Sequence, residues 1–198
     1  SILRQELICL GLAQQNDFGY DFQMSDFIFN VLDQSPVTSA TNPALAVAET
    51  IALAEHTDAL GYRRFWLAEH HNTSAFAGAA PEILIGHIAA RTQHLRVGSG
   101  GIMLPHYSPM KVAEVFRMLE TLAPKRIDLG LGRAPGGDAR TAAALQAGPK
   151  AWPAEVFPQQ VEMLIQFLED AAGLTGEAGG FPDAHPYQGI RAQPLGEH

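Results

Sequence analysis

The stretch FWLAEHHN (residues 65–72) joins a short apolar run to a carboxylate and two imidazoles. An apolar run of this length between polar residues predicts a β-strand over residues 64–68. Longer segments that favour helix flank it at residues 43–60 and 81–92. A strand between two helices is typical of a parallel sheet, in which helical crossovers connect successive strands.

The same rhythm extends along most of the chain. It predicts strands over residues 27–32, 64–68, 95–98 and 126–131, and helices over residues 43–60, 81–92, 109–122 and 158–170. At the first helix, Thr41 or Asn42 can cap the free amides, Pro43 suits the first turn, and Gly61 ends the helix. The Gly- and Pro-rich segment after Gly173 is predicted to be loop.

The fold class is α/β, and two architectures account for four strand–helix units. One is the (β/α)8 barrel of the TIM type, which has eight units in about 250 residues, so that this chain would be an incomplete barrel with the four N-terminal units. The other is a small doubly wound open sheet. An incomplete barrel leaves inward-facing side chains and two strand edges unsatisfied, so a partner, a later segment or a rearrangement would have to supply the rest.

Composition indicates a globular protein and argues against two classes of partner. Of the 198 residues, 46% are apolar and 17% charged, which is enough apolar content for a buried core. The formal net charge is -8, whereas nucleic-acid binders concentrate Lys and Arg on one face, so we expect no nucleic-acid partner. No apolar run reaches the roughly 20 residues that span a bilayer, so we expect no membrane partner. The single cysteine, Cys9, excludes an intrachain disulfide and makes the cytoplasm the simplest compartment.

Residues 1–23 stand apart from the repeated units. Met24 directly precedes Ser25, Asp26 and the first apolar run, as a start codon would. We therefore expect residues 1–23 to be a leader or N-terminal extension, and residues 24–198 to form one domain. An amphipathic N-terminal helix that caps the barrel is the alternative.

Glu69, His70 and His71 directly follow the second predicted strand, and active sites of parallel sheets lie at the carboxyl ends of the strands. A carboxylate with imidazoles forms a proton-transfer set poised near neutral pH, so Glu69 and at least one of the histidines are candidate catalytic residues. Successive residues at a strand end point to opposite sides, so His70 and His71 are not expected to face one ligand together. Purely structural histidines are the alternative. A metal site is not expected, because no second cluster of His, Asp or Glu has a suitable spacing.

Three glycines occur in VGSGGIMLP (residues 97–105), where the third predicted strand ends. Glycine weakens an ordinary strand, so this stretch, with Ser99, Gly100 and Gly101, is predicted to let the backbone closely approach a flat ligand. The alternative is a β-bulge or a tight turn.

The fourth predicted strand runs into RIDLGLGRAPGGD (residues 126–138). Its glycine spacing is not that of a dinucleotide-binding loop and Pro135 interrupts it, so a nicotinamide-binding Rossmann fold is not predicted. Arg133, at a strand end among glycine amides, suits an anionic group such as a ligand phosphate. The alternative is a salt bridge at the rim of the sheet, with Asp138 or Glu69.

These strand ends, taken in this order, resemble the bacterial luciferase-like family of flavin-dependent monooxygenases. The similarity runs over residues 27–138 and consists of short matching strings: LDQSP (32–36), AEHHN (68–72), APE (80–82), VGSGG (97–101), LP (104–105) and RIDLGLGRAPG (126–136). Each string alone is weak. Their order and spacing across four units identify the chain as similar to the N-terminal half of the family's (β/α)8 barrel.

The resemblance implies a role for individual residues. His70 matches the catalytic base, Gly100 and Gly101 match a pair joined by a non-prolyl cis peptide beneath the flavin ring, and Arg133 matches a residue near the FMN phosphate. With Ser99 beside the glycine pair, the expected cofactor-binding residues are Ser99, Gly100, Gly101 and Arg133. The family takes reduced FMN from a separate flavin reductase, adds O2 at the flavin and oxidises an aldehyde or another small organic substrate. We therefore expect His70, the glycine pair and Arg133 to surround one flavin-sized hollow.

The resemblance also implies a homodimer through the helices at residues 81–92 and 109–122. The expected contacts are the apolar residues Leu84, Ile88, Val112 and Phe116. Packing within the barrel is the alternative role for these four.

The family's fifth strand should follow near Pro194, whereas the sequence ends at His198. We therefore expect the isolated chain to bind FMN weakly or not at all, and to be inactive in that case. Two other functions agree with the resemblance. One is a non-catalytic flavin-binding protein, like the shortened members of the family, and the other is a deazaflavin-dependent hydride-transfer enzyme on the same barrel.

Overall fold

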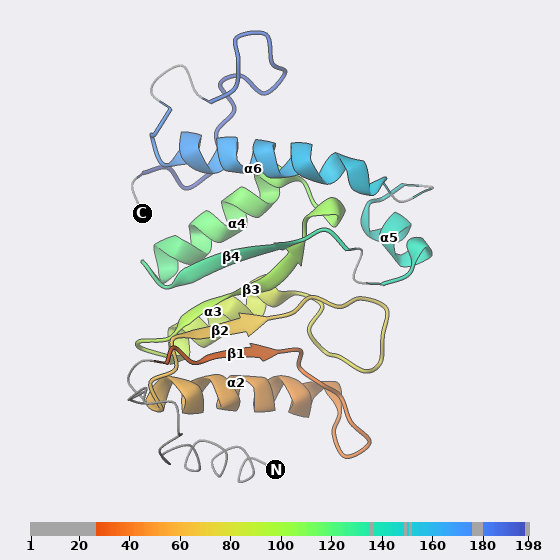
Figure 1. Ribbon diagram of the computed structural model, residues 1–198, viewed down its shortest axis with the longest axis vertical. Coiled ribbons are helices and arrows are strands. Elements are labelled where there is room, and N and C mark those ends of the chain that lie inside the picture. Colours follow the sequence, from red (N-terminus) through yellow and green to blue (C-terminus); the bar gives the residue numbers. More distant parts are fainter. Residues whose placement is uncertain (1–26, 135–136, 149, 151, 176–179, 197–198) are drawn as a thin grey trace, which may run out of the picture.

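Four parallel strands form one sheet, in the order β1-β2-β3-β4, in a computed structural model of the protein (Figure 1). The structure describes residues 27–134, 137–148, 150, 152–175 and 180–196, so the expectations for residues 1–23 and for Pro135 lie outside the described residues. The strands are β1 (Asn30–Asp33), β2 (Arg64–Leu67), β3 (Arg96–Met103) and β4 (Ile127–Gly132). One row of the register runs across all four strands through Val31, Phe65, Val97 and Ile127.

The strand order distinguishes an incomplete barrel from a doubly wound sheet. In a doubly wound sheet the order reverses at a switch point. Here each new strand is added at the same edge, and right-handed crossovers then place the connecting helices on one face, as in a (β/α)8 barrel (Figure 1). The chain therefore has the fold of four successive βα units of a barrel.

Four helices confirm the predicted ones, each within one residue at either end. They are α2 (Pro43–Ala59), α3 (Pro81–Arg91), α4 (Pro109–Leu122) and α6 (Phe157–Ala171). Each has proline in its first turn, where the ring's fixed φ suits the helix and no amide is lost from the ladder. At α2 the cap is Asn42, whose side chain accepts a hydrogen bond of 3.0 Å from the Leu45 amide. The last helix, α6, packs on α4 (Figure 1).

Two elements differ from the predictions. β3 continues to Met103, beyond the predicted end at residue 98, because Gly98 pairs with Asp128 of β4 instead of ending the strand; a register shift between Ser99 and Ile102 accommodates Gly100 and Gly101. A short helix, α5 (Ala139–Leu145), follows β4, with 3-10 turns at η2 (Leu104–His106) and η3 (Ala154–Val156). The predicted loop is confirmed in its described part, since residues 180–196 contain no helix or strand.

The core lies between the sheet and the helices. Alternate side chains of β2 and β3 point into it, and Phe65, Leu67 and Val97 are fully buried in one cluster with Ile85 and Ile88 of α3. This alternation is what a period of two along a strand produces when one face is covered by helices.

The four expected dimer contacts pack within the fold. Ile88, Val112 and Phe116 are buried in the core, and Leu84 packs against it. This packing within the fold is the alternative role stated for them, and the dimer itself stays a prediction. The exposed apolar side chains of α3 and α4 are others, namely Ile83, Met118 and Leu122, of which Ile83 is 70% and Leu122 71% exposed.

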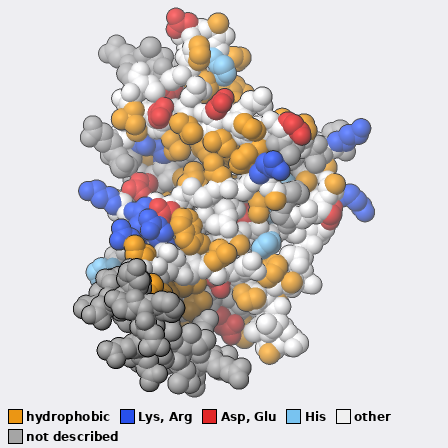
Figure 2. Space-filling model, in the orientation of Figure 1, with side chains coloured by type: hydrophobic (Ala, Val, Ile, Leu, Met, Phe, Trp, Pro, Cys, Tyr) orange, Lys and Arg blue, Asp and Glu red, His pale blue; other side chains and the backbone are white. Residues whose placement is uncertain are grey.

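No helix of the described residues covers the opposite face of the sheet (Figure 1). Toward the carboxyl ends of the strands this face is apolar: Leu32 is 58% exposed, Trp66 is half-buried, and both lie beside Gly100. Figure 2 shows hydrophobic side chains over the middle of this face and Lys and Arg side chains gathered where the strands begin. The uncovered face thus changes from charged to apolar along the strand direction.

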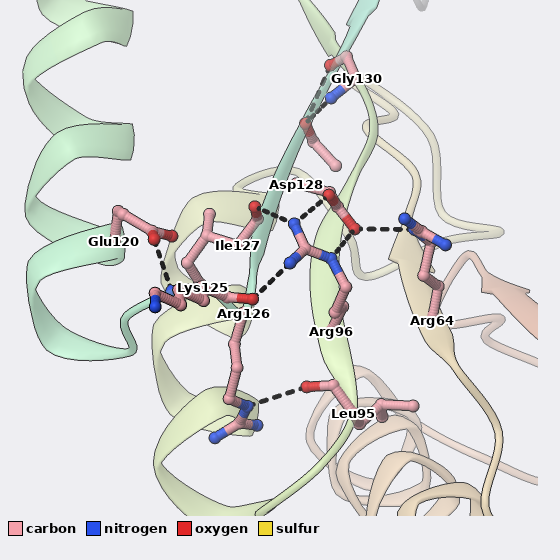
Figure 3. A network of polar contacts seen from close by, with 10 residues as sticks. Arg64, Leu95, Arg96, Glu120, Lys125, Arg126, Ile127, Asp128 and Gly130 are labelled. Atoms are coloured by element: carbon pink, nitrogen blue, oxygen red, sulfur yellow. Dashed lines mark hydrogen bonds and ion pairs between the residues drawn. The ribbon is translucent and has the colours of Figure 1, made fainter. Parts of the chain in front are cut away.

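A charge network occupies the start of this face (Figure 3). Asp128 of β4 accepts hydrogen bonds at 3.0 Å from Nε of Arg64 and at 3.0 Å from Nε of Arg96, and a second one at 2.5 Å from Arg96 Nη2. The Arg96 guanidinium also donates to the carbonyls of Lys125 and Ile127. The network ties β2, β3 and β4 together across the sheet.

Asp128→Asn is expected to lower the free energy of unfolding by about 2 kcal/mol at neutral pH, because two guanidinium groups lose their common anion. Burial raises the pKa of Asp128, but the hydrogen bonds and charge of Arg96, with those of Arg64, outweigh burial and hold the pKa below its ordinary value. The pKa of Asp128 is lower in the folded state than in the unfolded state. Its contribution to stability is therefore fully present above the unfolded-state pKa and is lost as pH falls through the folded-state pKa.

Urea titrations of wild type and variant across acid and neutral pH measure this effect. The difference in free energy of unfolding between wild type and Asp128→Asn should be smaller in acid than at neutral pH. Asp183→Asn, at an exposed aspartate that contacts only Gln188 among the described residues, is the control and should change little. Equal stability of Asp128→Asn and wild type at neutral pH would contradict the network's role.

The tail after α6 is held by one buried arginine. Arg117 of α4 donates from Nε to the Pro194 carbonyl and from Nη2 to the Gly196 carbonyl, both at 2.6 Å.

None of the described helices combines the length and apolar character that crossing a bilayer would require.

Candidate functional site

The residues singled out in the sequence follow the carboxyl ends of the strands. Because β1 to β4 are parallel, the segments after β2, β3 and β4 emerge at the same edge of the sheet, where α5 also lies (Figure 1). This is the edge at which parallel α/β folds carry their sites. Glu69 and its neighbours come from β2, η2 and Tyr107 from β3, and Arg133 and α5 from β4.

Glu69 is completely buried and both of its oxygens are engaged. Oε1 accepts a hydrogen bond of 2.7 Å from the Tyr107 hydroxyl and lies 2.6 Å from His71 Nε2, and Oε2 accepts one of 2.9 Å from the Met103 amide. The expected catalytic role of Glu69 stays a prediction. In the structure this carboxylate holds the Tyr107 hydroxyl, the Met103 amide and the His71 ring around it.

The two histidines have different surroundings, as the alternation along a strand predicts. His71, two residues from Glu69, turns toward that carboxylate. His70 stacks on Phe76 with ring centroids 4.6 Å apart, and its backbone amide donates to the Gly78 carbonyl at 2.9 Å. His70 is half-buried, and its ring is held against Phe76.

Two further ionisable groups, Tyr107 and Glu82, lie around this carboxylate. Burial and the hydrogen bond to Glu69 raise the pKa of Tyr107, so its hydroxyl stays a donor. Burial and then the negative charge of Glu69 raise the pKa of Glu82, although its own backbone amide and His71 partly offset this. Glu82 Oε2 is buried and has no hydrogen-bond partner among the described residues.

Glu82→Gln is expected to make the fold more stable near neutral pH. The folded-state pKa of Glu82 is raised, so the stability that wild type has below the unfolded-state pKa is lost as pH rises through the folded-state pKa. The glutamine carries no charge to bury. The melting temperatures of wild type and Glu82→Gln should therefore be similar in acid and differ increasingly toward neutral pH. The control is Glu49→Gln, at an exposed glutamate of α2, whose melting temperature should stay close to that of wild type at every pH. A melting temperature of Glu82→Gln below that of wild type at neutral pH would contradict this.

Two of the three glycines of β3 lie close against β4. A Cβ on Gly98 would overlap the Asp128 carbonyl, and one on Gly101 would lie 2.8 Å from the Gly130 carbonyl. The bulge given as the alternative is present, in the register shift of β3. Gly100 differs: a Cβ there would lie 3.1 Å from Leu32 Cδ1 and 3.1 Å from Trp66 Cβ, on the uncovered face. The Gly100–Gly101 peptide bond is cis, as the resemblance implied.

Ser99 was expected among the cofactor-binding residues and is fully buried. Its hydroxyl donates to the Gly130 carbonyl at 2.9 Å and accepts from the Gly130 amide at 3.1 Å. The side chain therefore bridges β3 and β4 where the register shifts, and it does not reach the uncovered face.

Arg133 is exposed and has no hydrogen bond or ion pair with another described residue. The rim salt bridge considered as its alternative is absent from the described structure, because Asp138 caps α5 and Glu69 is occupied by other donors. A guanidinium at a strand end with its donors unengaged is available for an anionic group.

A hollow of about 960 Å³ lies at this edge, between the segment after β2 and α5. His71 and Asn72 line one side, and Asp138, Arg140 and Thr141 are on the other. Of the expected site residues, His70, the glycine pair and Arg133 do not line this hollow. The single hollow predicted around them stays a prediction; His70 and Gly100 belong to the strand ends, and His71 lines this hollow.

The rim of the hollow is ordered by its own polar contacts. Asn72 donates to Asp138 at 3.2 Å and to Thr141 at 2.9 Å. The amides of Arg140 and Thr141 donate to Asp138, and with the Thr141 hydroxyl and Asn72 they lower the pKa of Asp138 to about 2. Sequence reasoning missed α5, although Asp138 before an alanine-rich run is a helix N-cap pattern that predicts it.

Within the described part of the chain, no three His, Cys, Asp or Glu side chains are grouped to hold a metal ion.

Comparison with known proteins gives consistent results. A family model described as luciferase-like monooxygenase matches residues 24–165. The uncharacterised protein YwcH of Bacillus subtilis (strain 168) is 50% identical over 165 residues, which cover 83% of this chain and 46% of YwcH. The N-acetyl-S-alkylcysteine monooxygenase of the same organism is 45% identical over 165 residues, with coverage of 83% and 46%.

Solved structures share the fold. Apo-MsnO8 has a TM-score of 0.70 at 40% identity, covering 86% of this chain and 48% of that one. The oxygenating constituent of 3,6-diketocamphane monooxygenase from Pseudomonas putida, a type II Baeyer-Villiger monooxygenase in complex with FMN, has a TM-score of 0.64 at 17% identity, with coverage of 73% and 39%. The chain spans about half the length of the curated relatives it matches. Because the family model matches most of the sequence, the chain belongs to the luciferase-like monooxygenase family.

Proposed function

We propose that the chain carries the flavin-facing strand ends of a flavin-dependent monooxygenase that uses reduced FMN and O2 to oxidise a small organic substrate. The observation that carries the proposal is the apolar end of the uncovered face, where Leu32 and Trp66 flank the bare backbone of Gly100. A flat ring system requires such a surface, with no side chain rising from its middle.

The residues at this edge suit FMN in three respects. Any side chain at Gly100 would fill the space beside Leu32 and Trp66, so glycine keeps the apolar surface open to an isoalloxazine ring. Arg133 has an unengaged guanidinium among the described residues, which suits the phosphate. His70, held against Phe76 at the end of β2, would hold or take up a proton near the ring.

When bound, reduced FMN supplies the electrons with which O2 is activated, chemistry that no side chain provides. The protein's part is to orient the ring on the Leu32–Trp66 surface, to exclude water from that surface, and to place the His70 imidazole as a base. A separate flavin reductase in the cytoplasm is the proposed source of reduced FMN.

Relatives support the proposal at the level of the reaction. A relative with 45% identity is named a monooxygenase of N-acetyl-S-alkylcysteine, and a structure with the same fold contains FMN. We propose aldehydes and thioethers as the substrate classes to test. We also propose a homodimer through the exposed residues Ile83, Met118 and Leu122 of α3 and α4. A monomer in sedimentation at micromolar concentration would contradict this dimer.

His70→Ala tests the proposed role of the base. We expect FMN affinity to stay within about twofold of wild type, while product formation from reduced FMN, O2 and a panel of aldehydes and thioethers falls about 100-fold. The control is His94→Ala, an exposed histidine before β3, which should leave both quantities unchanged. Equal turnover of His70→Ala and wild type would contradict the assignment.

The same measurements separate the competing functions. FMN binding without product from any substrate in wild type would indicate a non-catalytic flavin-binding protein. Binding of the deazaflavin F420 in preference to FMN, seen in the absorption spectrum of the bound cofactor, would indicate a hydride-transfer enzyme. Either result would overturn the proposed monooxygenase function.

A further inference from the structure

His71 and Glu69 form a pair that the proposed role of His70 does not use. Glu69 is completely buried, and its Oε1 lies 2.6 Å from His71 Nε2. His71 lines the hollow of about 960 Å³ beside α5. Its side chain is 10% exposed, so the ring is fixed in the wall and touches the hollow at one edge.

The hydrogen-bond donors around Glu69 determine where the His71 proton sits. The Met103 amide and the Tyr107 hydroxyl both donate to Glu69, and both interactions favour the charged carboxylate, which can only accept. His71 Nε2 must then be the donor in its 2.6 Å contact with Oε1. The other ring nitrogen, Nδ1, has no hydrogen-bond partner among the described residues, and in the neutral ring it is then the acceptor.

We propose that Glu69 is a positioning residue that fixes the His71 proton on Nε2, so that Nδ1 accepts a proton or hydrogen bond from a ligand group in the hollow beside α5. A carboxylate behind an imidazole orients the ring and strengthens its basicity, as in histidine–carboxylate pairs of other active sites. The geometry of the pair is independent of any cofactor, whereas its use in catalysis rests on the proposed function.

The chemistry of the hollow defines the ligand group. The group must donate a hydrogen bond to Nδ1, as a hydroxyl, an amide N–H or a protonated acid does. Asn72, Thr141 and Asp138 hold one another in place around the opening, so the rim needs no rearrangement to receive such a group. Ala144 and Leu145 add an apolar side. The ligand is therefore a small organic molecule, or part of the cofactor, with a polar donor beside an apolar portion.

Nitrogen-15 NMR of the histidine side chains in the 198-residue chain tests the pair directly. In wild type, His71 should show a protonated Nε2 and an unprotonated Nδ1, whereas exposed His94 should exchange between tautomers. Glu69→Gln should release His71 into a mixture of tautomers. Tyr107→Phe removes one donor to Glu69 but leaves the His71 contact, so it should keep the wild-type tautomer and serves as the matched control. It also keeps the test decisive if Glu69→Gln does not fold.

Addition of reduced FMN under nitrogen, alone and with an aldehyde or thioether, tests the role of Nδ1. A shift of the His71 Nδ1 resonance that exceeds any shift at His94 supports the proposal. A mixed or reversed tautomer of His71 in wild type overturns it, whether or not FMN binds. FMN or substrate binding that leaves Nδ1 unmoved also overturns it. A fixed tautomer that is lost in Glu69→Gln, together with no FMN binding at all, supports the positioning pair, whose geometry does not depend on the proposed flavin function.

Discussion

Gly98→Ala is expected to cost at least about 3 kcal/mol of the free energy of unfolding, at the upper end of what one added methyl group costs in a packed interior. Gly98 pairs with Asp128 in the register of β3 and β4. A Cβ at this position would overlap the Asp128 carbonyl oxygen and lie 2.7 Å from the Asp128 Cβ. Backbone atoms cannot swing aside as a side-chain tip can, so the two strands would have to separate.

Urea unfolding followed by circular dichroism measures this loss. Gly148→Ala is the matched control, because a Cβ at Gly148 would make only ordinary contacts, the nearest 3.4 Å away, with its φ outside the left-handed region. We expect the control to change stability by less than about 0.5 kcal/mol. Comparable small losses for both variants would show that β3 and β4 are not packed as closely as described.

Arg126→Met is expected to cost about 3 kcal/mol, because three carbonyl groups lose a charged donor while most of the side chain's apolar length is kept. Arg126 donates to the carbonyls of Ala89, Thr92 and Leu95 at 3.0, 2.8 and 3.0 Å (Figure 3 shows the bond to Leu95). Its Nη2 also lies 2.5 Å from the Thr92 hydroxyl. The arginine thus satisfies the free carbonyls where α3 ends and β3 begins.

Thermal and urea unfolding of Arg126→Met and of Arg91→Met measure the difference. Arg91 pairs with Glu55 at 2.6 Å on the surface, with side chains 50% and 39% exposed, so its replacement should cost only about 0.5 kcal/mol. A loss at Arg126 no larger than that at Arg91 would contradict its role in joining α3 to β3.

Much of the fold follows from local sequence features. Proline in the first turn of a helix, the cap at Asn42 and apolar runs at regular spacing place four helices almost to the residue. The periodicity of apolar residues does not predict the order of the strands in the sheet. Four βα units build a half barrel or a doubly wound sheet from the same pattern, and only the addition of each strand at one edge separates them.

β3 shows why glycine-rich strands are hard to predict. Its glycines have low strand propensity, so the sequence suggests an end at residue 98. At Gly98 and Gly101, β4 lies too close for any side chain, and this depends on a segment about 30 positions later in the sequence. The role of Ser99 also depends on this later segment, because its hydroxyl hydrogen-bonds to the backbone of Gly130.

At the candidate site, the sequence indicates the right strand ends but not the division of labour among their residues. The cluster of Glu69, His70 and His71 is visible, yet the burial of Glu69 depends on Tyr107 and Met103, which come from the next βα unit. The resemblance to the luciferase-like family supplied the expectations for His70 and Arg133. The structure leaves both side chains accessible to a ligand.

Titration of the protein with FMN, followed by backbone amide NMR, shows whether a flavin binds at the carboxyl ends of β2, β3 and β4, as we propose. Millimolar FMN makes even weak binding visible. We expect saturable shifts confined to the amides of residues 69–72, 99–101 and 130–134, with those of Arg64, Arg96 and Asp128 at the start of the strands unmoved. Saturable shifts centred on Arg64, Arg96 and Asp128 instead would contradict the proposed site.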